Sequence, residues 1–460
     1  MSAVEAPPAP VLAGPVPPAK PPSLLKVIRE ADRNVVSLIP IEAYEKPIMR
    51  LSIGPRQILL VSDPAGVKRV LLDNVSNYPK SPIGIHVLGA AFGDGLLTSD
   101  GEKWRSHRRI MSPAFDHKSI VSYTPAMTET IGHWMEKWRS LERPIKVDIA
   151  DEMTSLTLQL ISRTMFSSDS DGICALMGDT LRRGTDAMQF RLRQALPLIG
   201  PWARRRRIAS IRRIFGGLDR SIYRLIEARG KLKGEAPRDL LDRLVAARDG
   251  ETGAKLTDEE VRDEVVIIFM AGHETTAVAM TFVWYLISQH PEVEARLHRE
   301  IDTVLGSRVP MHEDLERLPY VRMVIEEAMR LYPPAPALSS RQCQTEDMIC
   351  GRRIESREPV AVLPWVLHRH RALWDDPERF DPERFTPEKS AQRPRFAYMP
   401  FGGGPRICIG ASLAMTEASL ILAMMAQRYR LRLAPRHKVS LQFRVTLRPR
   451  GGMKMILELR

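Results

Sequence analysis

The chain has 460 residues, of which 44% are hydrophobic and 27% charged, a composition typical of a globular protein with a large buried core. Lysine and arginine exceed aspartate and glutamate by 13, but the basic residues are spread along the chain and no nucleic-acid-binding motif is found. The four cysteines include no C-x-x-C pair, so a disulfide framework, a zinc ribbon or an iron–sulfur cluster is not expected.

The N-terminal segment, residues 1–24, is rich in proline and alanine, which predicts a flexible tail ahead of a single domain over residues 25–460. It lacks the basic and then apolar pattern of a signal peptide. The strongest apolar run, Val265–Ala271, is far shorter than the roughly 18 residues that a membrane span needs. We therefore expect a cytoplasmic protein without a transmembrane anchor.

Short strands and a helix are expected directly after the tail. Ile48–Ile53 and Gln57–Ser62 flank a Gly-Pro pair and predict two strands, and a helix should follow from Asp63 to about Asp73. The segment Tyr78–Ser99 mixes glycine and proline with apolar residues, which favours a loop whose apolar side chains turn inward.

The next part of the chain is predominantly helical. Trp104 and Arg108 are four residues apart and share one face of a predicted helix. Residues 124–247 are nearly all helical in pattern, and within them Trp202 precedes the basic run Arg204–Arg207. Such a run is usually a solvated face, and the alternative is a surface that contacts an anionic membrane or a protein partner.

The longest predicted helix covers Thr257–Gln289 and begins with a capping box, in which Thr257 is followed three residues later by Glu260. Polar residues interrupt its apolar centre, namely Gly272, Glu274, Thr275 and Thr276. Polar groups are costly in a buried helix, so they indicate a functional role. The dipeptide His273-Glu274 does not belong to a zinc-protease motif, because the second histidine is replaced by Ala277.

A further helix is predicted over Leu318–Tyr332, with Glu327 and Arg330 three residues apart on one face. On its own this pattern describes an ordinary surface pair. Short strands follow at Leu338–Gln342 and Pro359–Leu363.

A glycine-rich loop with a single cysteine precedes the predicted helix Ala411–Arg428. Its characteristic residues are Phe401, Gly404, Arg406, Cys408 and Gly410. A cysteine at a helix start lies near unpaired N–H groups, which favour the thiolate over the thiol. Taken alone, the loop would be a turn around a buried, inert cysteine.

Together these motifs resemble the cytochrome P-450 family of haem-thiolate monooxygenases. The loop has the pattern Phe-x-x-Gly-x-Arg-x-Cys-x-Gly of the family's haem-binding segment, and Ala271–Thr276 has the pattern of its oxygen-activating helix. The resemblance covers about residues 25–460. It implies a mainly α fold with a smaller β-rich part, in which haem b lies between the long helix and the helix after the cysteine.

The resemblance also implies roles for individual residues. Cys408 would be the axial ligand of the haem iron, and Glu274 and Thr275 would deliver protons. The other residues expected around the cofactor are Arg406, Trp104, Arg108, Arg341, Ala271, Gly272, Phe401, Gly404 and Gly410. Glu327, Arg330 and Arg384 would form one buried structural network, with Arg384 favoured over Arg379 by its spacing.

A hydrophobic small-molecule substrate is expected from the apolar candidates for the pocket, Ile83, Ile85, Val87, Leu88, Phe269, Met270, Ala337 and Leu338. No flavin or NAD motif is found, so electrons are expected from a separate ferredoxin or flavodoxin and an NAD(P)H-dependent reductase. The alternatives are a peroxide-driven peroxygenase, a haem-binding protein without turnover, and a hydrolase that uses Cys408 as its nucleophile.

Overall fold

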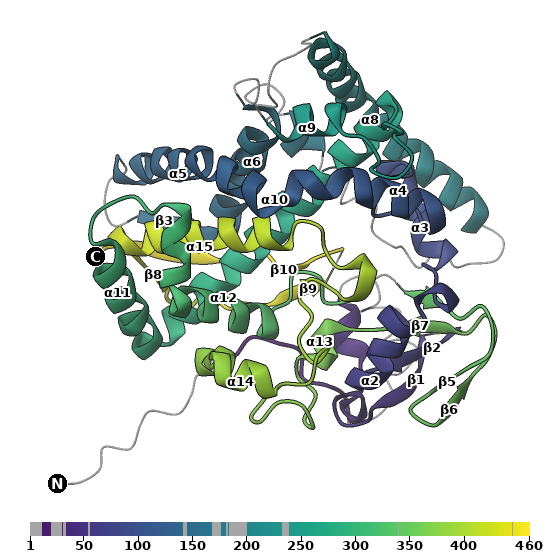
Figure 1. The fold of residues 1–460 in the computed structure, drawn as a ribbon. Helices are drawn as coiled ribbons and strands as arrows, with labels where there is room; N and C mark the ends of the chain where they lie inside the picture. Colours follow the sequence, from purple (N-terminus) through teal and green to yellow (C-terminus); the bar gives the residue numbers. More distant parts are fainter. Residues whose placement is uncertain are drawn as a thin grey trace.

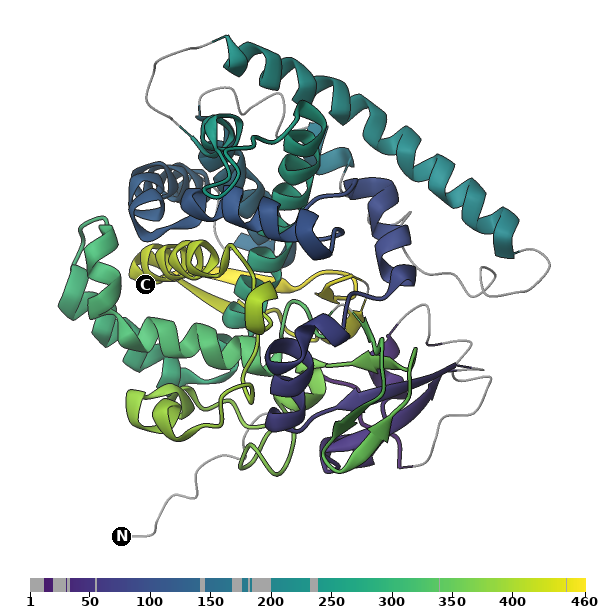
Figure 2. The same cartoon turned by 45° about the vertical axis from the view of Figure 1, so that its right-hand side comes forward.

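The computed structural model describes residues 12–19, 30, 34–53, 56–140, 145–167, 176–180, 183, 200–231, 239–338, 340–443 and 445–460. Most of these residues lie in helices, and Figures 1 and 2 show a large helical part beside a smaller part that contains most of the short strands. The α-helices are α2 (Pro64–Lys68), α3 (Pro82–Phe92), α4 (Gly101–Met111), α5 (His117–Arg139), α6 (Ile149–Phe166), α8 (Gly200–Gly230), α9 (Leu240–Ala246), α10 (Asp258–Gln289), α11 (Pro291–Leu305), α12 (Pro319–Leu331), α13 (Pro364–Leu367), α14 (Pro387–Gln392) and α15 (Ala411–Arg428).

The described strands form two sheets and two hairpins. They are β1 (Ile48–Ile53), β2 (Arg56–Val61), β3 (Ile145–Asp148), β4 (Arg341–Gln342), β5 (Asp347–Ile349), β6 (Arg352–Ile354), β7 (Pro359–Ala361), β8 (Tyr429–Leu433), β9 (Leu441–Phe443), β10 (Leu447–Pro449) and β11 (Lys454–Leu459). One sheet has the order β1-β2-β7-β4 and the other β3-β11-β8, while β5 pairs with β6 and β9 with β10. The antiparallel partner of Val360 in β7 is Arg341, which fixes that arginine on an edge strand.

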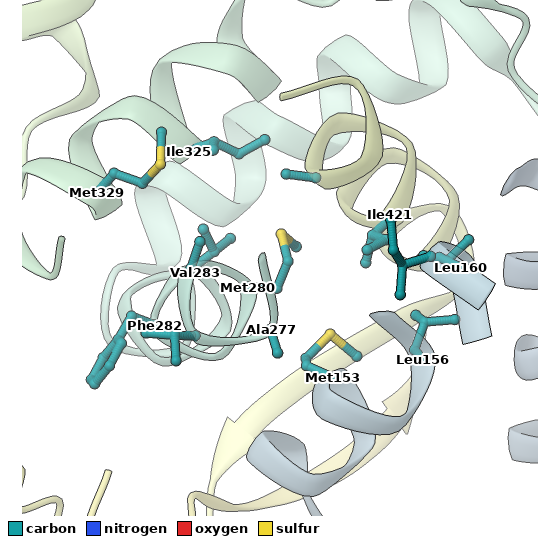
Figure 3. Packing of buried hydrophobic residues seen from close by; sticks show 14 of the residues in the cluster. Met153, Leu156, Leu160, Ala277, Met280, Phe282, Val283, Ile325, Met329 and Ile421 are labelled. Carbon is teal, nitrogen blue, oxygen red and sulfur yellow. The ribbon is translucent and has the colours of Figure 1, made fainter. Parts of the chain in front are cut away.

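The long helix α10 is the centre of the helical part, as the sequence predicts. Thr257 caps it, and both halves of the capping box with Glu260 are formed. Figure 3 shows its apolar side chains, including Met280 and Val283, packed among residues of α6, α12 and α15. Among the described residues, α10 is the one helix long and apolar enough to cross a membrane, and most of that stretch is buried inside the fold.

Two segments differ from the sequence interpretation. The sequence predicts a loop over Tyr78–Ser99, but its centre forms helix α3, which has Pro82 in its first turn, where a missing N–H costs nothing. In the proline-rich segment, residues 12–19 contact the fold, because the Tyr332 hydroxyl donates to the Ala13 carbonyl over 2.8 Å. The rest of residues 1–24 lies outside the described residues, and the domain division stays a prediction.

The side chains of Glu327 and Arg330 are fully buried in α12. Arg330 Nε and Nη2 lie 2.6 and 2.8 Å from the two carboxylate oxygens of Glu327. Arg330 also donates to the carbonyls of Pro377 and Arg379, and Arg384 Nε lies 3.5 Å from Glu327 Oε1. The network therefore attaches α12 to the irregular segment that leads toward the cysteine loop.

Replacing Glu327 by alanine leaves the buried Arg330 without its counter-charge. We expect Glu327→Ala to lower the free energy of unfolding by about 3–5 kcal/mol and to give little folded protein. The measurement is the yield of soluble, folded protein together with its melting temperature.

The control is Glu227→Ala, which removes an exposed carboxylate paired with Lys231 one helical turn away. An exposed pair of this kind contributes about 0.3–0.5 kcal/mol, so the control should fold normally. Equal behaviour of the two variants would show that the Glu327 network is no more important than a surface pair.

Candidate active site

A cavity of about 360 Å³ lies between α10 and the loop that carries Cys408. Its α10 wall is made by side chains that are small or apolar around a pair of threonines, namely Ile267, Ile268, Ala271, Gly272, Thr275, Thr276 and Ala279. Phe401, Gly402 and Gly403 line the opposite side, and the first turns of α15 close the cavity behind Cys408. The two segments that the sequence singled out, far apart in the chain, therefore face one space.

The backbone of the cysteine loop is fixed by contacts that only glycine permits. Gly404 has a φ of +69°, and a Cβ atom there would lie 1.9 Å from the Leu71 carbonyl oxygen. The Cys408 N–H donates to the Phe401 carbonyl over 2.9 Å, which closes the loop. Arg108 Nη1 donates to the Ile407 carbonyl over 2.8 Å and thereby attaches α4 to it.

The Cys408 thiol lines the cavity, and its environment opposes a free thiolate. Burial raises the pKa of the Cys408 thiol, although the Gly410 N–H and the charge of Arg108 act in the other direction. The expectation that the helix start favours the thiolate is thus outweighed by desolvation. A thiolate at this position needs a further positive partner, which a bound metal ion provides.

Cationic side chains gather at one end of the cavity. Arg406 pairs with Asp100 and lies over the Trp104 ring, with its guanidinium carbon 5.5 Å from the ring centre. Arg341 is buried, and its Nε and Nη1 have no hydrogen-bond partner, like Nε of Arg406. Burial and the charge of Arg406 lower the pKa of Arg341 to about 10. The buried Arg341 guanidinium group, which has two nitrogen atoms without a partner, indicates a site for an anionic group.

Sequence reasoning missed Lys80, which lines the same end of the cavity. Its ammonium group donates to the carbonyls of Leu96, Leu97 and Ser99 over 3.1, 2.9 and 2.8 Å. Burial lowers the pKa of Lys80 to about 8, and Arg341 adds to the lowering. In the sequence, a single lysine in a glycine- and proline-rich segment does not indicate that its side chain lines a cavity.

The centre of α10 divides its polar residues between two sides. Thr275 faces the cavity, and its hydroxyl donates to the Ala271 carbonyl over 2.6 Å. Glu274 is buried but does not line the cavity: its Oε1 accepts from the Thr446 hydroxyl and from Arg448 Nε, the latter over 2.8 Å. Its Oε2 has no partner. The two residues predicted to transfer protons are therefore adjacent in sequence but lie in different surroundings, because Thr275 faces the cavity and Glu274 does not.

Of the residues predicted for the substrate pocket, Leu338 lines the cavity. Phe269 packs instead against Phe166, with ring centres 5.2 Å apart. The remaining ones with described side chains, Ile85, Leu88, Met270 and Ala337, do not line it, and the side chains of Ile83 and Val87 lie outside the described part of the chain. The apolar wall comes instead from Leu96, Leu97, Phe115, Ile161, Ile267, Ile268 and Pro334.

Glu417 is a second residue that sequence reasoning missed. It lies in α15, lines the cavity, and its Oε1 is buried without a partner. Burial raises the pKa of Glu417 to about 8, so the carboxyl is mostly neutral at pH 7. The sequence does carry a signal for it, because Glu417 stands within the largely apolar run Leu413–Ala426, as Glu274 does within α10.

Comparison with known proteins assigns the family. The sequence model of the cytochrome P450 family matches residues 23–455. Cyclooctatin synthase from Streptomyces melanosporofaciens is 36% identical over 418 residues, which cover 89% of this chain and 88% of the relative. Cyclooctat-9-en-7-ol 5-monooxygenase from the same organism is 35% identical, over 84% of this chain and 83% of the relative. The crystal structure of the cytochrome P450DA heme domain has a TM-score of 0.79 and 28% identity, with 90% of each chain covered.

The chain belongs to the cytochrome P450 family. It is a haem-dependent monooxygenase with the mainly helical fold of that family, and bacterial proteins are among its relatives. The cavity suits haem by its own chemistry, because a thiol, an apolar wall and the buried Arg341, whose Nε and Nη1 have no partner, meet the needs of iron, porphyrin and a carboxylate.

The close approach of Gly404 to Leu71 can be tested directly. A methyl group on residue 404 would collide with the Leu71 carbonyl, so Gly404→Ala must displace the loop that positions Cys408. We expect the variant to lose most of its bound haem, measured as haem per polypeptide, and to melt at a lower temperature.

Gly306→Ala is the matched control, because Gly306 also has a positive φ, of +57°, but no atom lies within 4 Å of the place that a Cβ would occupy there. It should lose only about 1–2 kcal/mol through backbone strain and keep its haem. If both variants bind haem equally well, the contact with Leu71 does not fix the loop.

Proposed function

We propose that this enzyme inserts one oxygen atom from O₂ into a hydrophobic small molecule, using electrons from a separate ferredoxin or flavodoxin and its NAD(P)H-dependent reductase. The observation that carries the proposal is the cavity itself, in which the Cys408 thiol and the Thr275 hydroxyl lie in walls that are otherwise largely apolar. Among the relatives, one is named for its action on cyclooctat-9-en-7-ol, which supports a largely hydrocarbon substrate.

Cys408 would hold the haem iron, and Lys80, Arg341 and Arg406 would hold its propionates. When bound there, a thiolate-ligated haem supplies the reductive activation of O₂. The apolar wall around it excludes water, which protects the activated oxygen from side reactions and favours a hydrophobic substrate. An acidic electron carrier matches the excess of 13 positive charges on this chain.

Thr275 is suited to hold a proton donor at the cavity surface. Its hydroxyl hydrogen is directed to the Ala271 carbonyl, so the Oγ1 lone pairs remain available to accept from a water molecule in the cavity. Gly272 adds no side chain to the adjacent wall, and a Cβ atom there would lie 3.3 Å from the Ile161 side chain. The hydroxyl therefore orients water where oxygen must be protonated.

Glu274 would connect this position with solvent. Its partner Arg448 is about one third exposed, with Nη2 only 2.6 Å from Glu274 Oε1. Protons can reach the buried carboxylate along this side, and its unpartnered Oε2 leaves one oxygen free to accept them. Proton delivery then requires Glu274 to exchange its contact with Arg448 for one with water near Thr275.

Removal of the Thr275 hydroxyl should uncouple the reaction. Thr275→Ala keeps helix propensity, so folding and haem content should be retained. With reductant, partner proteins and O₂, we expect at least a ten-fold lower ratio of oxygenated product to NAD(P)H consumed, because general acid–base groups contribute about 10²–10⁴-fold. Peroxide or water should replace the product.

Thr281→Ala is the control, since Thr281 lies on the same helix and makes the same bond, over 2.7 Å to the Ala277 carbonyl, but does not line the cavity. The ratio of oxygenated product to NAD(P)H consumed should be the same in Thr281→Ala as in the wild type. An unchanged ratio in Thr275→Ala would remove the proton-delivery role, and product formed with peroxide alone at the full rate would favour the peroxygenase alternative.

A further inference from the structure

Helix α8 carries a basic outer surface that the reaction does not use. Figures 1 and 2 place this long helix along the outer edge of the helical part. Its inner side chains are buried against the core, including Ile211, Phe215, Leu218 and Ile222. Eight exposed residues on the other side define the α8 basic face, namely Trp202, Arg205, Arg206, Arg212, Arg213, Arg220, Tyr223 and Arg224. The same side also exposes Glu227 near the end of the helix, where it pairs with Lys231.

No carboxylate among the described residues neutralises the positive charge of this face. Residues 200–218 contain six arginines and no acidic residue. Among the described residues, no carboxylate pairs with the arginines of the α8 basic face, which are Arg205, Arg206, Arg212, Arg213, Arg220 and Arg224. Many other arginines do form such pairs, for example Arg262 with Asp219. The helix N-terminus adds its own positive dipole to the same end.

Exposed aromatic residues lie at both ends of the α8 basic face. Trp202 is 60% exposed and Tyr223 is 40% exposed. Arg206 lies over the Trp202 ring, with its guanidinium carbon 4.3 Å from the ring centre. The two aromatic residues are separated by about 30 Å of helix at 1.5 Å per residue. Such a face combines positive charge spread along one side of a helix with aromatic groups that prefer the boundary between water and lipid.

We propose that the α8 basic face binds the surface of a bilayer that contains anionic phospholipids. Arginine is suited to this partner because its guanidinium group binds phosphate with two parallel hydrogen bonds. The aromatic side chains would enter the headgroup region, while the inner side of α8 stays packed on the fold. The protein would thus be held at the membrane surface through the α8 basic face.

An electron carrier fits this face less well. In Figures 1 and 2, α10 lies between α8 and α15, the helix that follows Cys408. A carrier docked on α8 would be separated from the thiol by the thickness of α10. The side of α8 that faces inward instead approaches the cavity wall, because Phe215 packs edge-on against Phe92 at the end of α3, shortly before Leu96 and Leu97.

Membrane binding would place this wall close to a reservoir of hydrophobic molecules. The supply of substrate from the membrane rests on the proposed function, whereas membrane binding itself does not. Either claim can therefore fail without the other. The test therefore measures binding and not turnover.

The experiment is flotation of the haem-loaded full chain with vesicles of phosphatidylglycerol mixed with phosphatidylcholine, compared with vesicles of phosphatidylcholine alone. The wild type should float with the anionic vesicles only, and less so as salt is raised. The variant R205Q/R206Q/R212Q/R213Q should bind at least about a hundred-fold more weakly, since each basic residue contributes roughly five-fold at such a surface. The single variant W202S, which leaves the charge unchanged, should also bind the anionic vesicles more weakly than the wild type.

The matched control is R139Q/R299Q/R317Q/R395Q, which removes the same charge from exposed arginines elsewhere. It should float like the wild type, which separates the α8 basic face from the net charge. The proposal is overturned if the wild type ignores anionic vesicles, or if the two four-fold variants bind equally. Binding of duplex DNA in preference to vesicles, lost in the α8 variant, would also overturn it and identify a nucleic acid as the partner.

Discussion

Desolvation destabilises a thiolate and so raises the pKa of a thiol. Cys408 borders the cavity and is subject to this effect, which Arg108 and the Gly410 N–H oppose. The pKa of the Cys408 thiol nevertheless stays above its usual value. A haem iron bound by Cys408, as we propose, would supply positive charge at the sulfur, so that cofactor binding would favour the ionisation of Cys408. The glycine loop, its contact with Leu71 and the bond from Arg108 all serve to keep this sulfur directed into the cavity.

The opposite imbalance exists at the other end of the cavity. Besides burial, Arg341 and Arg406 lower the pKa of Lys80, and Arg406 lowers that of Arg341, while Asp100 acts in the other direction on both. One end of the cavity therefore lacks positive charge beside Cys408, and the other lacks an anionic partner for Arg341, whose buried Nε and Nη1 have no hydrogen-bond partner. A ligand with a cationic centre and carboxylates at one edge supplies both. This complementarity explains why residues from α4, β4 and the cysteine loop converge there although each is ordinary alone.

Much of the fold and part of the site follow from the sequence. The length, the capping box and the polar centre of α10 are local signals, and the cysteine loop is a contiguous motif, so both could be predicted. Contacts between distant segments could not. Glu274 and Arg448 are 174 residues apart, and no periodicity predicts that an arginine of a C-terminal hairpin reaches the central helix. Leu338 lines the cavity as predicted, but Phe269 does not, because Phe269 is as apolar as Ile267 and only the rotation of α10 decides which of the two faces the cavity.

The state of Cys408 in the reduced protein tests the account most directly. The haem-loaded wild type is reduced, exposed to carbon monoxide, and its Soret band recorded beside those of Cys408→His and of alanine variants at Cys174, Cys343 and Cys350. A thiolate ligand predicts a strongly red-shifted band in the wild type and in the three alanine variants, and its loss in Cys408→His. A red-shifted band that persists in Cys408→His, or a wild type without one, would contradict the assignment of Cys408 as the iron ligand.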